Sequence, residues 1–354
     1  MKLICNQGEL SEVLSIVSRA ASGRTYPILE SILIDATGSE VTCSATNMEL
    51  AIKMSVPQIE VLDSGSILVS GKILTDIVRK LPAGKVEIAT TDSGAMIKSG
   101  KSKFNLPVIP ADQFIQLKEP SGAQFFVNAD ELKTAIKQTI FATVADDPRP
   151  FISSALFETT ADKLTIVATD VNRLAVREVP ISGGPELTFL LSAKSLKELM
   201  GIIRGQIALS VDSNQFFVMA EGLTVSCQLV NAQYPKYRQV IPKESSGKVM
   251  MERREFIRSL ERTSLISDSA KFEITADRMF ISSRESDRGE FREEVEVQKS
   301  GQDYVSGFNT KFLLEFAKAV DAKEIEMSYS DPLRPALLKA GNDDYFNVVM
   351  PMKL

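Results

Sequence analysis

Residues 70–81 read S-G-K-I-L-T-D-I-V-R-K-L, and two later stretches repeat the pattern: S-A-K-S-L-K-E-L-M-G-I-I at 192–203 and N-T-K-F-L-L-E-F-A-K-A-V at 309–320. Each opens with Ser or Asn, whose side-chain oxygen can accept a hydrogen bond from a free N–H at a helix start. Apolar residues then recur at the spacing of one helix face. They are Leu74, Ile77 and Leu81; Leu196, Leu199 and Ile203; and Leu313, Phe316 and Val320. We therefore expect three equivalent helices, roughly 120 residues apart.

A second helix start recurs at similar intervals. In each case a polar residue precedes a glutamate by three positions, which is the spacing of a capping box. These pairs are Asn6 and Glu9, Asn128 and Glu131, and Glu252 and Glu255. Apolar residues follow on one helix face, at Leu10 and Leu14, Leu132 and Ile136, and Phe256 and Leu260. Six helix starts at matched spacing indicate a triplicated unit.

The segments between the helices, at 31–46, 155–170 and 271–285, alternate apolar and polar residues around Asp, Gly and Thr. This pattern is typical of antiparallel strands. Each unit also closes on a proline, at Pro110, Pro242 and Pro351. We predict an α+β protein of three tandem copies, each reading helix, strands, helix, strands. Polar stretches at 119–122 and 243–247 place the domain boundaries at 1–119, 120–243 and 244–354.

The composition narrows the possible functions. The chain has no histidine, which removes the commonest general base and the commonest metal ligand. The three cysteines, Cys5, Cys43 and Cys227, are scattered, so neither a disulfide framework nor a zinc site is indicated. No apolar run reaches the ~18 residues that span a bilayer, and the N-terminus does not resemble a signal peptide. We expect a cytoplasmic protein without metal or cofactor.

Several motifs resemble catalytic ones but lack a required residue. Residues 65–72 read G-S-I-L-V-S-G-K, with one residue too many between the glycines for a P-loop and isoleucine after the lysine. Residues 245–248 match S-x-x-K, but no K-T-G follows. The Asp pairs at 146–147 and 343–344 have no third ligand at a recognisable spacing. An enzyme on a tandem α+β scaffold is one alternative hypothesis, and these absences argue against it.

Four stretches resemble one known family. Residues 167–176 read V-A-T-D-V-N-R-L-A-V, the chain ends V-V-M-P-M-K-L at 348–354, and residues 233–240 and 23–29 read Q-Y-P-K-Y-R-Q-V and G-R-T-Y-P-I-L. Together with the triplication, they resemble the bacterial DNA polymerase III beta subunit, the sliding clamp of the DNA-clamp superfamily. The chain departs from that family's pattern at Val171-Asn172, where the family has Gly-His, and at Lys353, where it has Arg. Because a β-branched residue replaces glycine at Val171, we expect a changed pocket shape.

The resemblance implies a non-catalytic processivity factor. Two chains would join head to tail into a six-domain ring, with helices lining the bore and sheets outside, around duplex DNA. The ring would tether DNA polymerase III alpha subunit and other proteins with a clamp-binding motif, and a clamp loader would open it. The dimer interface would involve Ile77, Leu81, Phe104 and Leu106 of one chain against Leu265 and Ile266 of the other.

The helices provide a test that is visible in the sequence. Lys72, Lys194 and Lys311 each lie in the first helical turn, where a cation opposes the helix dipole. Their repetition suggests phosphates nearby, although the net charge of the chain is -5. The DNA-binding residues implied are Arg24, Lys72, Arg79, Lys80, Lys133, Lys137, Arg149, Lys194, Lys197, Arg204, Lys311 and Lys318. A structural or adaptor protein that never touches DNA is the other alternative hypothesis, and these lysines argue against it.

The resemblance also implies a pocket for short partner peptides between the second and third units. An apolar concavity that contains methionine and arginine suits several different peptides, because methionine adapts its shape. The expected lining is Ile152, Thr169, Val171, Leu174, Pro235, Val240, Val348 and Met350. The expected rim is Arg149, Arg173, Pro351 and Met352.

Overall fold

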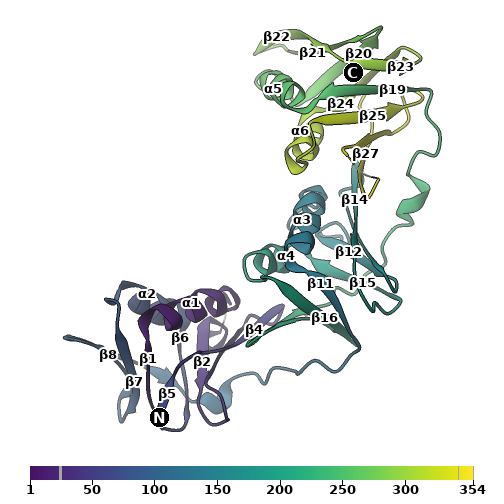
Figure 1. Ribbon diagram of the computed structural model, residues 1–354. Helices are drawn as coiled ribbons and strands as arrows, with labels where there is room; N and C mark the ends of the chain where they lie inside the picture. Colours follow the sequence, from purple (N-terminus) through teal and green to yellow (C-terminus); the bar gives the residue numbers. More distant parts are fainter. Residues whose placement is uncertain (24–25, 342, 354) are drawn as a thin grey trace. The chain divides into compact units, whose positions relative to one another are not determined.

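The computed structural model describes residues 1–23, 26–341 and 343–353 (Figure 1). They form two compact units, one of residues 1–129 with 194–229 and the other of residues 130–193 with 230–354. Each unit contains one whole terminal repeat and part of the central repeat. The units cut across the sequence repeats because neighbouring repeats share β-sheets.

Both expected sets of helices are present. The first helices of the repeats are α1 (Gln7–Val17), α3 (Ala129–Thr139) and α5 (Arg253–Thr263), and the second are α2 (Gly71–Lys80), α4 (Ala193–Met200) and α6 (Thr310–Ala319). Short 3-10 turns are η1 (Ser18–Ala20), η2 (Pro27–Glu30), η3 (Ala111–Gln113), η4 (Ile140–Ala142) and η5 (Tyr237–Gln239). Figure 1 shows α1 beside α2 and α5 beside α6. No described helix is long and apolar enough to cross a membrane.

The first unit contains two antiparallel sheets. The five-stranded sheet has the order β5 (Glu60–Asp63), β1 (Lys2–Asn6), β7 (Lys85–Thr91), β8 (Gly94–Ser99), β9 (Ser102–Leu106). The nine-stranded sheet has the order β10 (Val108–Ile109), β6 (Ser66–Ser70), β2 (Ser31–Asp35), β3 (Thr42–Thr46), β4 (Leu50–Ser55), β18 (Leu223–Gln228), β17 (Gln215–Ala220), β16 (Gln206–Asp212), β11 (Gln124–Asn128). Repeats 1 and 2 meet where β4 pairs with β18, with Leu50 opposite Cys227.

The second unit repeats this arrangement. Its nine-stranded sheet has the order β15 (Leu187–Ser192), β12 (Ser154–Thr159), β13 (Lys163–Thr169), β14 (Arg173–Pro180), β27 (Tyr345–Val349), β26 (Ala336–Lys339), β25 (Glu324–Tyr329), β19 (Gly247–Glu252), β23 (Gln298–Gly301). Its four-stranded sheet has the order β22 (Gly289–Glu296), β21 (Arg278–Glu285), β20 (Ser269–Thr275), β24 (Tyr304–Asn309). Repeats 2 and 3 meet where β14 pairs with β27, with Leu174 opposite Val348.

The predicted apolar faces form the cores. Leu10 and Leu14 of α1 and Leu313 and Phe316 of α6 are at most 1% exposed, and Phe316 stacks on Tyr345 with ring centroids 5.4 Å apart. Burying a side chain of this size stabilises a fold by about 1.5–3 kcal/mol. The periodicity that predicts the helices is therefore the pattern that holds them against the sheets.

The helix caps differ in detail from the prediction. The side chains of Asn6 and Asn309 accept hydrogen bonds from the amides of Gly8 and Lys311, and that of Glu252 accepts one from the amide of Glu255 at 2.7 Å. The expected cap bond of Ser70 is absent in the described structure of α2.

Each repeat also begins with a strand that the sequence analysis did not predict: β1, β11 and β19. These strands run directly into the helix start. Five or six residues are too few to separate a period of two from the helix that follows.

Candidate functional site

The turn between β13 and β14, residues 169–173, is held by its own polar side chains. The Asp170 carboxylate is 8% exposed, and its Oδ1 accepts hydrogen bonds from the amides of Asn172 and Arg173, both at 3.0 Å. The Thr169 hydroxyl accepts a hydrogen bond from the Val171 amide at 3.1 Å and donates one to the Arg173 carbonyl. The sequence folds this way because Asp and Thr side chains readily accept a hydrogen bond from the backbone amide two residues later.

Val171 lies at the tip of this turn in a strained conformation. Its φ is +72°, and 53% of its surface is exposed. Positive φ is rare for any residue but glycine and costs most for a β-branched one. The substitution noted in the sequence therefore changes the chemistry of the tip while the backbone keeps a geometry suited to glycine.

Arg173, which we expect at the rim of the pocket, lies largely inside the fold. The residue is 7% exposed, and its Nε donates to Asp170 Oδ2 at 3.0 Å while Nη2 donates to the Phe141 carbonyl at 2.6 Å. Its Nη1 pairs with Glu315, and its guanidinium lies 4.3 Å from the ring centroid of Phe312. A guanidinium engaged in this way supports the turn from inside the fold.

The C-terminal segment lies beside the turn. The Met350 amide donates to the Asn172 carbonyl at 2.8 Å, so the two segments form one surface. Val348 is buried, whereas Met350 and Met352 are 38% and 39% exposed, and Pro351 is partly buried between them. The Met352 amide donates to the Gly307 carbonyl, which fixes the tail to β24.

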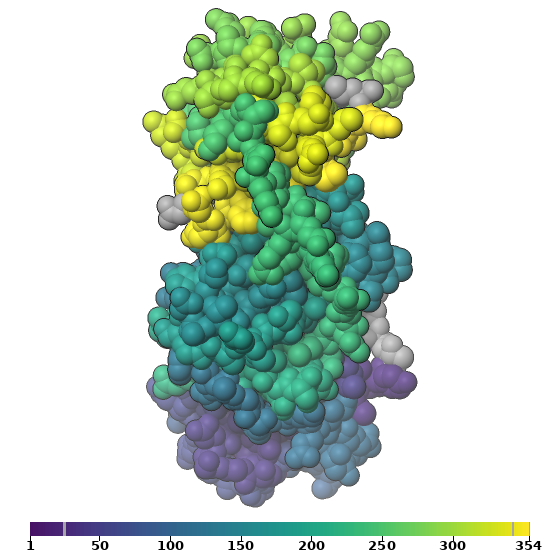
Figure 2. Space-filling model, turned by 90° about the vertical axis from the view of Figure 1, so that its right-hand side faces the viewer, coloured from purple at the N-terminus to yellow at the C-terminus, as the bar shows by residue number. Residues whose placement is uncertain are grey.

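A strap, residues 230–241, packs against the buried apolar cluster that contains Leu174 and Val348. Its green atoms lie at the surface in Figure 2. The Tyr234 hydroxyl donates to the Val167 carbonyl at 3.2 Å, and Tyr237 and Arg238 both donate to Glu158. Burial raises the pKa of the Glu158 carboxyl, but the hydrogen bonds from Arg238 and Tyr237 outweigh it and lower the pKa below its usual range. The strap thus covers the sheet while its own Pro235 and Val240 remain exposed.

Two of the expected pocket residues, Leu174 and Val348, lie on one face of the shared sheet. Leu174, Val348, Leu156 and Tyr237 belong to one buried apolar cluster, and the side chains of Arg173 and Val349 point to the opposite face because neighbours along a strand alternate. Ile152 has no exposed surface, so in this conformation it can only support the pocket. Val171, Val240 and Met350, which we also expect to line the pocket, are exposed. Exposed apolar groups that include a methionine suit a short peptide with apolar anchors.

Arg149 lies near the start of the segment that enters β12. It is exposed and makes two side-chain hydrogen bonds to Asp147, which lower the pKa of that carboxyl below its usual range. A hollow of about 530 Å³ also opens under the strap, lined by Leu156, Leu190 and Tyr237.

The basic residues expected to face DNA are mostly exposed on helices. Among the described residues Lys72, Lys80, Lys137 and Lys197 form no ion pair. The others have partners: Arg79 with Asp76, Lys133 with Asp130, Lys194 with Glu49, Lys311 with Asp268, and Lys318 with Glu261. Arg204 donates to the Ile203 carbonyl, and Arg24 lies outside the described residues.

The residues expected at the dimer interface differ in exposure. Leu265 is 74% exposed and Phe104 is 39% exposed, whereas Leu81 is buried and Ile77, Leu106 and Ile266 are half-buried. Phe104 lies on β9 and Leu265 follows α5. Of the six expected interface residues, Leu265 and Phe104 are therefore the most exposed.

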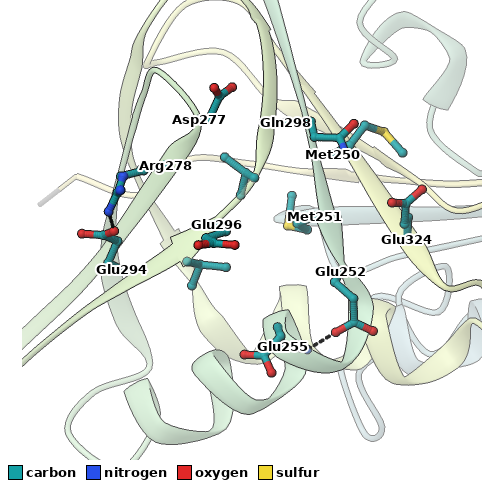
Figure 3. Close-up of a pocket in the computed structure, with 12 residues that line it drawn as sticks. Met250, Met251, Glu252, Glu255, Asp277, Arg278, Glu294, Glu296, Gln298 and Glu324 are labelled. Atoms are coloured by element: carbon teal, nitrogen blue, oxygen red, sulfur yellow. Dashed lines mark hydrogen bonds and ion pairs between the residues drawn. The ribbon is translucent and has the colours of Figure 1, made fainter.

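A hollow of about 580 Å³ in repeat 3 is dominated by carboxylates (Figure 3). Figure 3 shows Arg278 paired with Glu294, and the Glu252 carboxylate bonded to the amide of Glu255. In the described residues no group of His, Cys, Asp or Glu is arranged to hold a metal ion. The hollow therefore contributes a strongly acidic surface beside β22.

Sequence reasoning missed the residues that hold the turn from the third repeat. Glu315 and Phe312 lie on α6. In the sequence of a helix, a glutamate is read as an ordinary exposed residue and a phenylalanine as an ordinary core residue. The three-residue spacing of Asp170 and Arg173 was a local signal for their ion pair. No sequence signal pointed to Glu315.

Comparison with known proteins agrees with these features. Residues 1–118, 126–236 and 238–353 match the N-terminal, central and C-terminal domains of the DNA polymerase III beta subunit. The chain is similar to the DNA polymerase III beta subunit structure from Thermotoga maritima, with 30% identity, a TM-score of 0.94, and coverage of 100% of this chain and 99% of that one. It is 26% identical to the beta sliding clamp of Bacillus subtilis and 28% identical to that of Synechocystis sp., each over 100% of both chains. The chain belongs to the DNA polymerase III beta subunit family.

Proposed function

We propose that this protein is a sliding clamp, a ring-shaped processivity factor that encircles duplex DNA without sequence specificity and tethers replication and repair proteins to it. The observation that carries the proposal is a rule of strand pairing between repeats. In both shared sheets, the third strand after one repeat's first helix pairs with the third strand after the next repeat's second helix. These pairs are β4 with β18 and β14 with β27.

The same rule leaves one pair unmade. The third strand after the first helix of repeat 3 is β22, and the third strand after the second helix of repeat 1 is β9. Both are edge strands, of the four-stranded and the five-stranded sheet respectively. If β22 of one chain pairs with β9 of a second, the new sheet has nine strands, as each shared sheet already has. Two such junctions close a head-to-tail dimer.

Charge supports the pairing of these two edges. Exposed Lys101 and Lys103 lie at or on β9, whereas β22 carries exposed Glu290, Glu294 and Glu296. The acidic hollow of Figure 3 extends the negative surface beyond β22. An unpaired edge strand with charged side chains avoids indiscriminate pairing and selects an edge of opposite charge.

The lysines of the second helices support the contact with DNA. Lys72, Lys194 and Lys311 occupy the same position in α2, α4 and α6 and are all exposed. A clamp that slides needs contacts to phosphate rather than to base edges, and lysine supplies a mobile point charge for them. The helices would line the bore and the sheets would form the outer wall.

The remaining assignments complete the proposal. The protein has no catalytic role of its own, works in the cytoplasm, is opened by a clamp loader, and binds the DNA polymerase III alpha subunit and other clamp-binding-motif proteins. Their peptides enter the pocket formed by the turn 169–173, the strap and the C-terminal segment. The three domains run from 1–119, 120–243 and 244–354.

A charge-swap experiment tests the ring. One variant carries Lys101→Glu and Lys103→Glu, and the other carries Glu290→Lys and Glu296→Lys. Each alone should sediment as a monomer at micromolar concentration, because both junctions of its homodimer bring like charges together. Their mixture should sediment at twice the 38.9 kDa of the chain, because both junctions of the mixed ring are complementary. Dimers of each variant alone, or no dimer in the mixture, would contradict the assigned edges.

A further inference from the structure

The strained tip of the turn requires support from its surroundings. A β-branched residue with φ at +72° relaxes to negative φ unless neighbouring groups hold it. Val171 is 53% exposed, so its own packing provides only part of that support. The rest must come through the backbone on either side of it.

The Asp170 carboxylate fixes this backbone. Its Oδ1 holds the amides of Asn172 and Arg173, and its Oδ2 receives the Nε of Arg173. The carboxylate can hold both amides only while it keeps its orientation, and Arg173 sets that orientation. The two bonds from Arg173 are buried, so water does not readily replace them.

Arg173 is in turn held from another repeat. Asp170 and Phe141 belong to repeat 2, whereas Glu315 and Phe312 belong to α6 of repeat 3. The guanidinium lies 5.2 Å and 4.3 Å from the two ring centroids. Glu315, whose side chain is 47% exposed, supplies the only carboxylate from repeat 3 that pairs with Arg173 among the described residues.

The turn reaches the pocket through one further hydrogen bond. The carbonyl of Asn172, the residue after Val171, accepts the amide of Met350 at 2.8 Å. A change in the backbone at 171–172 therefore moves both the Val171 side chain and the start of the C-terminal segment. Val171 belongs to the turn and Met350 to the C-terminal segment, and both are exposed apolar residues.

We propose that Glu315 is a positioning residue for the partner-peptide pocket: through Arg173 and Asp170 it keeps Val171 at positive φ and Met350 in register. The inference rests on the proposed function of the pocket. It makes the shape of the pocket depend on the contact between repeats 2 and 3. Any movement that separates α6 from the turn loosens the peptide.

A double-mutant cycle tests this role. Glu315→Ala is measured in the wild-type chain and in the Val171→Gly chain, where the tip carries no strain and needs no support. The probe is a fluorescein-labelled short peptide from a polymerase that contains Gln, Leu and Phe. Glu315→Ala should weaken binding about fivefold in the wild-type chain and less than twofold in the Val171→Gly chain. Glu315→Gln, which keeps an acceptor, should lose less than Glu315→Ala.

A second readout needs no peptide. The amides of Asn172 and Arg173 should exchange with solvent about tenfold faster in Glu315→Ala, and Val171→Gly should remove most of that increase. Glu261→Ala is the matched control and should change neither readout, since Glu261 of α5 pairs with Lys318 of α6 inside repeat 3.

Three results separate the outcomes. Equal losses of peptide affinity in both backgrounds would show that the ion pair only stabilises the contact between the repeats, which overturns the positioning role. Unchanged exchange in Glu315→Ala would overturn it as well. If the wild-type chain binds no such peptide, the proposed pocket fails, and the exchange measurements still decide whether Glu315 holds the turn.

Discussion

Replacing Val171 with glycine and, separately, with alanine should reverse the usual stability order of these two residues. At ordinary backbone angles alanine is more stable than glycine by about 0.4–1 kcal/mol, because glycine has more freedom to lose. At positive φ an L-residue meets a steric cost of about 1–2 kcal/mol that glycine avoids. The φ of +72° at Val171 therefore favours glycine over alanine by about 1 kcal/mol.

Loss of the Val171 side chain adds a contribution of similar size that both substitutions share. With 53% of the residue exposed, truncation removes about half of the apolar burial, on the order of 1 kcal/mol. Glycine should therefore leave the melting temperature close to that of the wild-type chain, whereas alanine should lower it by about 2 °C. Comparing the two variants with each other removes most of the shared burial contribution.

The assay is thermal unfolding of the three proteins at one fixed concentration, because dimerisation makes melting temperatures depend on concentration. A control pair at Thr188 on β15, an ordinary strand position, should show the normal order, with alanine above glycine. If alanine is at least as stable as glycine at Val171 too, the strain argued for the turn does not exist.

Three other changes give separable results. Met350→Ala with Leu174→Ala should weaken the polymerase peptide at least tenfold without altering dimer mass, and the double change should cost less than the sum of the single ones; affinity within twofold of wild type would place the pocket elsewhere. Lys72, Lys194 and Lys311 lie in the first turns of their helices, and changing all three to Glu should reduce loading onto circular DNA while sedimentation still reports a dimer. Unchanged loading would mean that these lysines do not contact DNA. Because the pKa of Glu158 is lowered in the folded protein, its bonds to the strap contribute stability at neutral pH that is lost as the pH falls through that lowered pKa. Glu158→Gln should therefore make the melting temperature depend less on pH below about 4.5. An unchanged dependence of the melting temperature on pH would contradict the role of this carboxylate.

The sequence was most informative about the repeated helices and least informative about the partners of the strands. Apolar spacing within a dozen residues predicts α2, α4 and α6, because one helix face must be buried whatever lies against it. The pairing of β4 with β18 and of β14 with β27 joins segments far apart in the chain, and alternation in a strand does not identify its neighbour. The sheets that neighbouring repeats share, and the two compact units that result, could therefore not be predicted from local patterns.

The candidate site shows the same division. Val171 was recognisable from the sequence, because a β-branched residue replaced a glycine of the family motif, and its φ is positive in the structure. The buried position of Arg173 was not recognisable, because the residues that engage it come from Phe141 and from α6. Arginines in motifs are easily taken for binding groups, and only the three-dimensional contacts separate support from recognition.

The central claim is that the protein holds DNA by enclosing it. The most direct measurement is the amount of protein retained on circular and on linear DNA. The protein is loaded onto a nicked circular plasmid, half of the sample is linearised, and the salt concentration is raised to about 1 M, where phosphate contacts are largely screened. A topological clamp stays on the circle and leaves the linear DNA by sliding off its ends. Equal loss from the circular and the linear DNA would contradict enclosure and leave a protein held by charge alone.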